Sequence, residues 1–355
     1  MTETDTILVC SLAESTGKTA IAVALGRASK ERGESAGYMK PKGTRLRSVV
    51  GKTLDEDPKL AMSVLGLEAD LETLEPVVYS PTFVEGAIAG RADPAEIRER
   101  VREAFETLAA DHNRMLVEGG GRIDLGGVIE LTDVDLAELL DARVLLVAGY
   151  DDVYDLDSVL AAAERFGDRL AGVCFNAVES PDRSRLDTDG ISFLESRDVP
   201  VLGIVPRNET LAGVTVEELA AEIGGDLLVE PTEDHTIERF SVGAMGPDSA
   251  LRHFRRLQNA AVVTGGDRSE IQTAALEAPG VRCLILTGGH RPSGAVLGAA
   301  SEASVPVIAV RTDTLTTVER AESVVRGGRS RDEATVERMH DLLVDHVDLD
   351  RLFES

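Results

Sequence analysis

The sequence predicts an α/β protein, with a doubly wound, mostly parallel sheet followed by a smaller α/β domain. Three observations lead to this prediction. Runs of Val, Ile and Leu alternate with helical patterns up to residue 206, which is typical of parallel strands covered on both faces by helices. A Gly-Lys-Thr loop follows the first of these runs. Three more apolar strands nearer the carboxyl end finish in glycines or in a cluster of Asp and Thr.

The loop after the first strand is the feature around which the first domain is organised. An apolar strand at 7–9 turns through this loop into a helix of small residues. Backbone N–H groups and the positive end of the helix dipole gather at such a turn, which favours a polyphosphate. An ordinary turn between strand and helix is the alternative. The residues expected to hold a nucleotide are consecutive: Ser15, Thr16, Gly17, Lys18, Thr19 and Ala20.

Three of these loop residues have distinct expected roles. Gly17 lets the backbone approach a phosphate, Lys18 can reach the β- and γ-phosphates, and Thr19 can offer its hydroxyl to Mg²⁺. The leading glycine of the usual motif is absent, because Ser11 and Leu12 stand where it is expected. The match to a phosphate loop is therefore partial.

Polar residues also end the later strands of the first domain. Lys40 and Glu118 each follow an apolar strand, and Glu118 is itself followed by three glycines. Carboxyl ends of parallel strands meet at one edge, where ligands bind, and a carboxylate beside a phosphate loop is suited to Mg²⁺. We expect Asn176 and Pro206 to line a base pocket at the same edge. Solvated loop residues are the alternative in each case. The expected strands are 37–41, 114–118, 143–148, 170–176 and 201–206, with amphipathic helices from about 57 and at 93–109.

The second domain is expected to repeat the αβ pattern on a smaller scale. Its polar strand ends predict an anion or ligand site at one edge of a sheet. The alternative is that the glycines only shape tight turns and that Asp267 pairs with Arg268. The expected domains are 1–212 and 235–355, with a connector at 213–234 and a terminal helix from 332. The candidate ligand residues are Asp267, Arg268, Thr287, Gly288, Gly289, Asp313 and Thr314.

Composition excludes several classes of function. The net charge is -26, and the chain has only six lysines, all within the first 59 residues. This composition predicts a protein that works at high ionic strength, as in halophilic organisms. An acidic face for a basic partner is the alternative. Aromatic residues make up 3% of the chain and no basic patch occurs, so nucleic-acid binding is not expected. No apolar run approaches membrane-spanning length and no secretory signal is present, which predicts a cytoplasmic protein. The three cysteines have no metal-binding spacing.

Together these motifs resemble a known pair of domains. The first 206 residues resemble the dethiobiotin-synthetase-like P-loop NTPase fold, and residues from about 235 to 325 resemble the DRTGG domain. The two occur in this order in the amino-terminal, regulatory part of long phosphate acetyltransferases. An acetyltransferase domain is not expected within these 355 residues. The motifs that carry the resemblance are Gly17-Lys18-Thr19, Lys40-Pro41, Asp57, Glu118 with its three glycines, Asn176, Pro206, Gly266-Asp267-Arg268 and Thr287-Gly288-Gly289.

The resemblance implies roles for individual residues. Lys18 would bind phosphate, and Lys40 would face both the γ-phosphate and an acidic substrate group, so that both lysines would be catalytic in an ATPase or an ATP-dependent ligase. Asn176 and Pro206 would contact the base. The loop departs from the family pattern at Ser11, Ala13 and Glu14, which puts dethiobiotin synthesis itself in doubt. The residues that would hold Mg²⁺ are Thr19, Asp57 and Glu118.

Three functions are compatible with the sequence. The first is a regulatory protein of central, acetyl-phosphate or acetyl-CoA related, metabolism that binds ATP and Mg²⁺, with a DRTGG domain that senses a ligand or joins subunits. A homo-oligomer and a metabolic-enzyme partner are further expectations of this reading. The second is an ATP-dependent ligase or carboxylase for a small acidic metabolite, indicated by Lys40, Lys42 and Arg45 near the expected γ-phosphate. The third is a scaffold with a vestigial phosphate loop.

Overall fold

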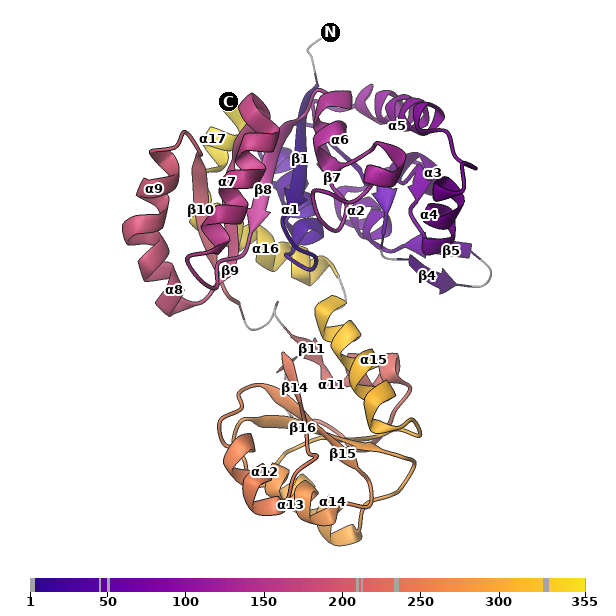
Figure 1. Cartoon of the computed structure of the whole chain (residues 1–355), viewed down its shortest axis with the longest axis vertical. Coiled ribbons are helices and arrows are strands. Elements are labelled where there is room, and N and C mark those ends of the chain that lie inside the picture. Colours follow the sequence, from indigo (N-terminus) through magenta and orange to yellow (C-terminus); the bar gives the residue numbers. More distant parts are fainter. Residues whose placement is uncertain are drawn as a thin grey trace. The chain divides into compact units, whose positions relative to one another are not determined.

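The computed structural model divides into two compact units, which we describe separately. It describes residues 4–44, 46–49, 52–208, 211, 213–232, 236–327 and 332–354. The first unit comprises Met1–Arg207 together with Arg331–Ser355, and the second comprises Asn208–Ser330 (Figure 1). The second unit is thus inserted into the sequence of the first.

A six-stranded, wholly parallel sheet forms the centre of the first unit. Its strand order is β10-β9-β8-β1-β7-β2, so that the chain starts near the middle and extends to both edges. The middle strands are fully buried runs of aliphatic residues, which agrees with helices on both faces. This confirms the predicted fold class. The strands are β1 (Asp5–Ser11), β2 (Ala36–Met39), β7 (Arg114–Glu118), β8 (Arg143–Ala148), β9 (Leu170–Val178) and β10 (Val201–Pro206).

Local sequence signals set the helix starts in this unit. Asp93 accepts a hydrogen bond from the backbone N–H of Ala95 and Pro94 occupies the first turn, so α5 begins where the sequence predicts it. Two short strand pairs, β3 (Lys42–Gly43) with β6 (Val77–Val78) and β4 (Leu46–Val49) with β5 (Lys52–Asp55), were not predicted. The helices are α1 (Lys18–Glu31), α2 (Asp57–Leu65), α3 (Leu71–Leu74), α4 (Pro81–Ile88), α5 (Pro94–Ala109), α6 (Asp133–Leu139), α7 (Asp155–Phe166), α8 (Ser180–Arg185), α9 (Ile191–Glu195), α16 (Glu333–His346) and α17 (Leu349–Glu354), with short turns η1 (Gly127–Ile129), η2 (Gly167–Arg169) and η3 (Leu186–Gly190).

The last two helices pack on the first unit, although the sequence prediction grouped them with the second domain. Helix α16 lies against α1, and the residue that follows it, Val347, bridges antiparallel to Gly203 on the edge strand β10. A Cβ at Gly203 would collide with the backbone of His346, so only glycine permits this approach. An amphipathic pattern shows that a helix buries one face, but it does not identify the surface that covers this face.

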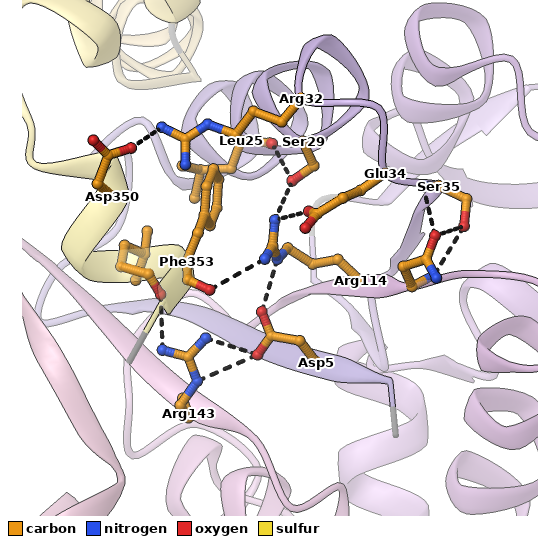
Figure 2. A network of polar contacts seen from close by, with 12 residues as sticks. Asp5, Leu25, Ser29, Arg32, Glu34, Ser35, Arg114, Arg143, Asp350 and Phe353 are labelled. Carbon is orange, nitrogen blue, oxygen red and sulfur yellow. Dashed lines mark hydrogen bonds and ion pairs between the residues drawn. The ribbon is translucent and has the colours of Figure 1, made fainter. Parts of the chain in front are cut away.

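Two arginines at the amino ends of the central strands hold helix α17. Arg114 is buried and its guanidinium lies 4.0 Å from the centre of the Phe353 ring (Figure 2). Arg143 donates to the carbonyl oxygen of Leu352 at 2.7 Å, and both arginines pair with Asp5. The chain end is therefore fixed to the sheet by cation–π contact, hydrogen bonds and a shared carboxylate.

A five-stranded sheet forms the second unit, with strand order β12-β17-β16-β15-β14. All pairings are parallel except that of the edge strand β12. Helices α12, α13 and α14 share one apolar core with this sheet, and α11 and α15 share another. The segment predicted as a connector contributes β11, α11 and β12 to this unit. Its elements are β11 (Val214–Thr215), α11 (Val216–Ile223), β12 (Asp226–Val229), β13 (Thr236–Ile237), β14 (Arg239–Val242), α12 (Pro247–Phe254), β15 (Ala260–Gly265), α13 (Ser269–Leu276), β16 (Val281–Thr287), α14 (Gly294–Glu302), β17 (Val307–Ala309) and α15 (Thr314–Gly327).

Within the described ranges, every helix is too short or too polar to cross a lipid bilayer.

Replacement of Phe353 by Ala is expected to destabilise the first unit. The change removes a buried ring and its contacts with Arg32 and Arg114, which corresponds to roughly 3 kcal/mol of unfolding free energy for a large-to-small core change. Urea denaturation of the whole chain would measure this loss. The exposed neighbour Glu354, replaced by Ala, is the matched control, and equal unfolding midpoints for the two variants would contradict the packing role of Phe353.

Candidate nucleotide site

The turn between β1 and α1 has the backbone geometry of an anion-binding loop. Gly17 precedes the helix with φ of 85°, and Ser15 also has a positive φ, of 59°. A Cβ at Gly17 would lie 2.7 Å from Nδ2 of Asn176, so a larger residue would meet both strain and collision. The N-cap residue of α1 is Gly17, which has no side chain to cap the first turn. The N–H groups of this turn and the helix dipole are thus directed at the space beyond the loop.

A cavity opens at this turn, at the carboxyl ends of β1, β2 and β7. The lysines Lys18 and Lys40, the hydroxyl of Thr19 and the carboxylate of Glu118 all line it, as the sequence motifs predict. Thr44 and the three glycines after Glu118 complete the wall. Backbone donors and two ammonium groups therefore surround one space, which is the arrangement that stabilises a polyphosphate. The loop residues in the wall are Glu14, Ser15, Thr16, Gly17, Lys18 and Thr19.

Lys18 bridges the two loops that border the cavity. Its Nζ donates to Oγ of Ser11 at 2.6 Å and to the carbonyl oxygen of Gly121 at 2.9 Å. Ser11 therefore uses its side chain where the usual motif has glycine. The side chain of Lys18 is buried, so its ammonium stays at the base of the cavity, within reach of a bound phosphate.

Glu118 joins three elements at the floor of the cavity. Its Oε1 accepts a hydrogen bond from Thr19 at 2.8 Å, and its Oε2 accepts one from the hydroxyl of Tyr38 at 2.6 Å. Burial and the Glu118 carboxylate raise the pKa of Tyr38, which keeps the phenol protonated as a donor. Tyr38 was not predicted as a site residue. Its position two residues before Lys40 is the signal that could have indicated it, because side chains two residues apart in an extended chain point to the same side.

Lys40 lies among carboxylates that include two of the predicted metal ligands. Its Nζ is 2.7 Å from Asp55 and 3.5 Å from Oε1 of Glu118, and it also pairs closely with Asp57. Burial alone would lower the pKa of Lys40, but the three carboxylates outweigh it and raise the pKa, so the ammonium remains charged. Asp55 was not predicted either. It is buried, and burial raises its pKa in spite of Lys40.

The donors at this point suit a hard divalent cation. A hydroxyl from Thr19 and carboxylates from Asp57 and Glu118 are oxygen ligands of the kind that Mg²⁺ prefers. No group of three or more acidic, His or Cys side chains in the described ranges is arranged to hold a metal unaided. The residues fit a cation that takes its remaining ligands from phosphate oxygens and water.

Lys42 does not face the cavity as the ligase hypothesis expects. It is buried, and its Nζ donates to the carbonyl oxygens of Leu125 and Leu131 and lies 3.1 Å from Asp133. Asp133 also accepts the N–H of Gly120 at 3.0 Å. Lys42 therefore holds the glycine loop in place instead of contacting a ligand. Arg45, the third cation of that hypothesis, lies outside the described residues.

Asn176 lies near the carboxyl end of β9, two residues before its last residue, and Pro206 ends the neighbouring strand β10. Nδ2 of Asn176 donates to the carbonyl oxygen of Thr16 at 2.8 Å and so supports the phosphate loop. Pro206 is the last residue of β10, paired with Val178, and is partly exposed. Contact of either residue with a base stays a prediction.

Comparison with known proteins agrees with this geometry. A family model described as an AAA domain matches residues 5–215, more than half of the chain. The chain belongs to the AAA domain family. A second family model, described as a DRTGG domain, matches residues 218–324, so it begins within the segment predicted as a connector. The two-domain architecture indicated by the motifs is thereby confirmed.

Individual relatives cover the two domains to different extents. The ATP-dependent dethiobiotin synthetase of Aromatoleum aromaticum is 33% identical over 213 residues, 58% of this chain and 91% of that protein. The phosphate acetyltransferase of Pseudomonas putida is 24% identical over 353 residues, 94% of this chain and 49% of that protein. The chain thus spans about half the length of this acetyltransferase. A solved structure of the CBS and DRTGG domains of a Clostridium perfringens pyrophosphatase is 19% identical, covering 43% of this chain and 80% of that one, with a TM-score of 0.29.

The predicted ligand residues of the DRTGG domain are largely bound to one another or to backbone. Arg268 donates to the carbonyl oxygens of Gly243 and Met245, at 2.5 and 3.0 Å, and makes no ion pair with Asp267 in the described part of the chain. The hydroxyls of Thr287 and Thr314 lie 2.8 Å apart. Gly288 and Gly289 have φ of 81° and 71°, so they do shape a tight turn. Asp313 accepts the N–H of Thr316 and thereby caps the start of α15.

One further buried acid borders the AAA domain site. The carboxyl group of Glu75 packs directly over Gly43, so that a Cβ there would have to displace it. Burial, followed by the Asp55 carboxylate, raises the pKa of Glu75 to about 7, although Lys40 acts in the opposite direction. No sequence signal indicated this residue, because it follows the short helix α3 in a segment whose other acidic side chains are exposed.

The raised pKa of Glu75 predicts a stability change with pH. Between its ordinary pKa of 4.5 and about 7, the folded chain binds this proton more tightly than the unfolded chain. The stability that protonated Glu75 contributes is therefore complete at low pH and is lost as the pH rises through this window. Glu75→Gln cannot ionise and so escapes this loss. The difference in unfolding free energy between Glu75→Gln and the natural protein should therefore shift in favour of the variant by roughly 1–2 kcal/mol between about pH 5 and about pH 8. Urea denaturation at both pH values tests this. Exposed Glu72→Gln is the control, and the same pH profile for both variants would contradict the assignment.

Proposed function

We propose that the AAA domain of this chain binds ATP with Mg²⁺ and that the DRTGG domain makes the protein a regulatory one. The observation that supports this most directly is the cavity in which Lys18, Lys40, Thr19 and Glu118 meet at the amino end of α1. The N–H groups of the loop and Lys18 would hold the phosphates, and Thr19, Asp57 and Glu118 would hold the cation. Bound Mg²⁺ would offset charge on the phosphate oxygens.

The regulatory part of the proposal rests on the order of the two domains. The phosphate acetyltransferase of Pseudomonas putida matches this chain over 94% of the chain but only 49% of its own length. We infer a role in central, acetyl-phosphate or acetyl-CoA related, metabolism, with a small metabolite or a metabolic enzyme as partner. The DRTGG domain would bind that ligand or join copies of the chain. Its candidate contacts are the strand ends around Thr287, Gly288 and Thr314.

A second candidate function is an ATP-dependent ligase acting on a small acidic metabolite. It is favoured by the 33% identity that extends over 91% of an ATP-dependent dethiobiotin synthetase. The burial of Lys42 against Asp133 weakens it, since one of the cations expected beside the substrate acts within the fold.

Calorimetry of the full chain with ATP and Mg²⁺ in molar KCl tests the nucleotide site. The natural protein and the exposed-site control Lys59→Ala should bind ATP equally. Lys18→Ala should bind about 10–100-fold more weakly, because it loses charge-assisted hydrogen bonds to phosphate of roughly 1.5–3 kcal/mol. Absence of ATP binding by the natural protein, or equal affinity in the two variants, would refute the proposed function.

ADP release separates the two candidates. A regulatory site should release ADP slowly and at a similar rate across a panel of amino acids and carboxylates, because no acceptor completes the reaction. A ligase should instead accelerate at least about tenfold with one compound, as positioned acceptors do in general. Coupled detection of ADP in molar KCl measures this, with Lys18→Ala as the blank.

A further inference from the structure

One ammonium group, that of Lys40, lies among the carboxylates that we propose to hold a metal ion in the nucleotide site. Lys40, Asp55, Asp57 and Glu118 are each no more than 3% exposed, so this cluster is almost free of solvent. Oε1 of Glu118 lies 3.5 Å from the Lys40 ammonium and also accepts the hydroxyl of Thr19. The ammonium is therefore held by the same oxygen atoms that would face a cation bound to Thr19, Asp57 and Glu118.

The charges in the cluster favour occupation by a cation at all times. The carboxylates of Asp55, Asp57 and Glu118 all lie around this one ammonium, in a poorly solvated region where charges interact strongly. Loss of the Lys40 charge would make the cluster more negative and would remove the cation that already contacts these oxygens, so a divalent cation would be bound more readily. With Lys40 in place, a free metal ion must compete with a tethered ammonium that already contacts the carboxylates of Asp57 and Glu118.

A polyphosphate would change this competition. Lys40 lines the same cavity as Lys18 and the phosphate loop, so its ammonium can exchange a carboxylate for a phosphate oxygen by a side-chain movement. Asp55 is the carboxylate best placed to remain its partner. It accepts Lys40 at 2.7 Å on one oxygen and the N–H of Asp57 on the other, which fixes its orientation.

We propose that Lys40 is an internal counter-ion that keeps divalent metal out of the site until a nucleotide binds, with Asp55 as the positioning residue that retains Lys40 when the metal enters. This inference rests on the proposed function, because the incoming phosphates are what draw the ammonium away. The consequence is an order of binding: metal enters with the nucleotide and not before it.

Titration of the full chain with Mn²⁺ alone, followed by the electron paramagnetic resonance of the free ion, tests the exclusion without any nucleotide. Lys40→Met keeps the length of the side chain but loses its charge, and Lys59→Met makes the same change of net charge at an exposed position. Lys40→Met should bind one Mn²⁺ at least about tenfold more tightly than the natural protein and Lys59→Met. Equal or weaker binding by Lys40→Met would overturn the proposal. Failure of the proposed function would appear separately, as absent ATP binding in the natural protein.

A second measurement covers a Lys40→Met variant that is too unstable for titration. Mn²⁺ should raise its thermal unfolding midpoint more than it raises that of Lys59→Met, and equal shifts would count against the counter-ion role. Asp55→Asn leaves Lys40 with Asp57 and Glu118 as its carboxylate partners among the residues that the structure describes. In the presence of ATP it should bind Mn²⁺ about tenfold more weakly than the natural protein, whereas unchanged affinity would exclude Asp55 from the exchange.

Discussion

The structure of the site depends on satisfying one buried carboxylate. Glu118 accepts hydrogen bonds from the hydroxyls of Thr19 on α1 and Tyr38 on β2. It also forms an ion pair with Lys40, which follows β2. A buried carboxylate that loses such partners costs about 3–5 kcal/mol, so these elements are held in one arrangement. The same contacts that stabilise the fold therefore hold the phosphate loop, the candidate metal ligands and Lys40 around one cavity.

Much of this arrangement could be predicted because it follows from sheet topology. The loop at Gly17 lies between an apolar strand and a helix, and Lys40 and Glu118 end strands of the same kind. In a parallel sheet all three must emerge at one edge, whichever strand order the chain adopts. Two particulars had no local signal. Asp55 reaches Lys40 from a short hairpin, and Lys42 turns away because Asp133, far along the chain, receives it.

The remaining differences arise where a segment's partner is distant in sequence. Strands β12 and β14 at the edges of the second sheet are only four residues long and begin with a charged residue, so they lack the longer apolar runs that mark central strands. The role of Arg268 depends on the backbone of Gly243 and Met245, which only the fold brings near. Helix α16 was recognised as amphipathic, but its surface of contact on α1 lies some 300 residues away. The sequence pattern of a segment thus predicts whether it forms a helix or a strand, but tertiary packing determines which distant segment it contacts.

The inserted position of the second unit has a consequence for synthesis of the chain on the ribosome. Residues 208–330 leave the ribosome before α16 and α17, and domains generally fold as they emerge. The DRTGG domain can therefore be complete while the edge of β10 and the outer side of α1 are still uncovered. Arg114 and Arg143 meet their partners Phe353 and Leu352 only after more than 200 further residues have been translated, so the first unit is completed late.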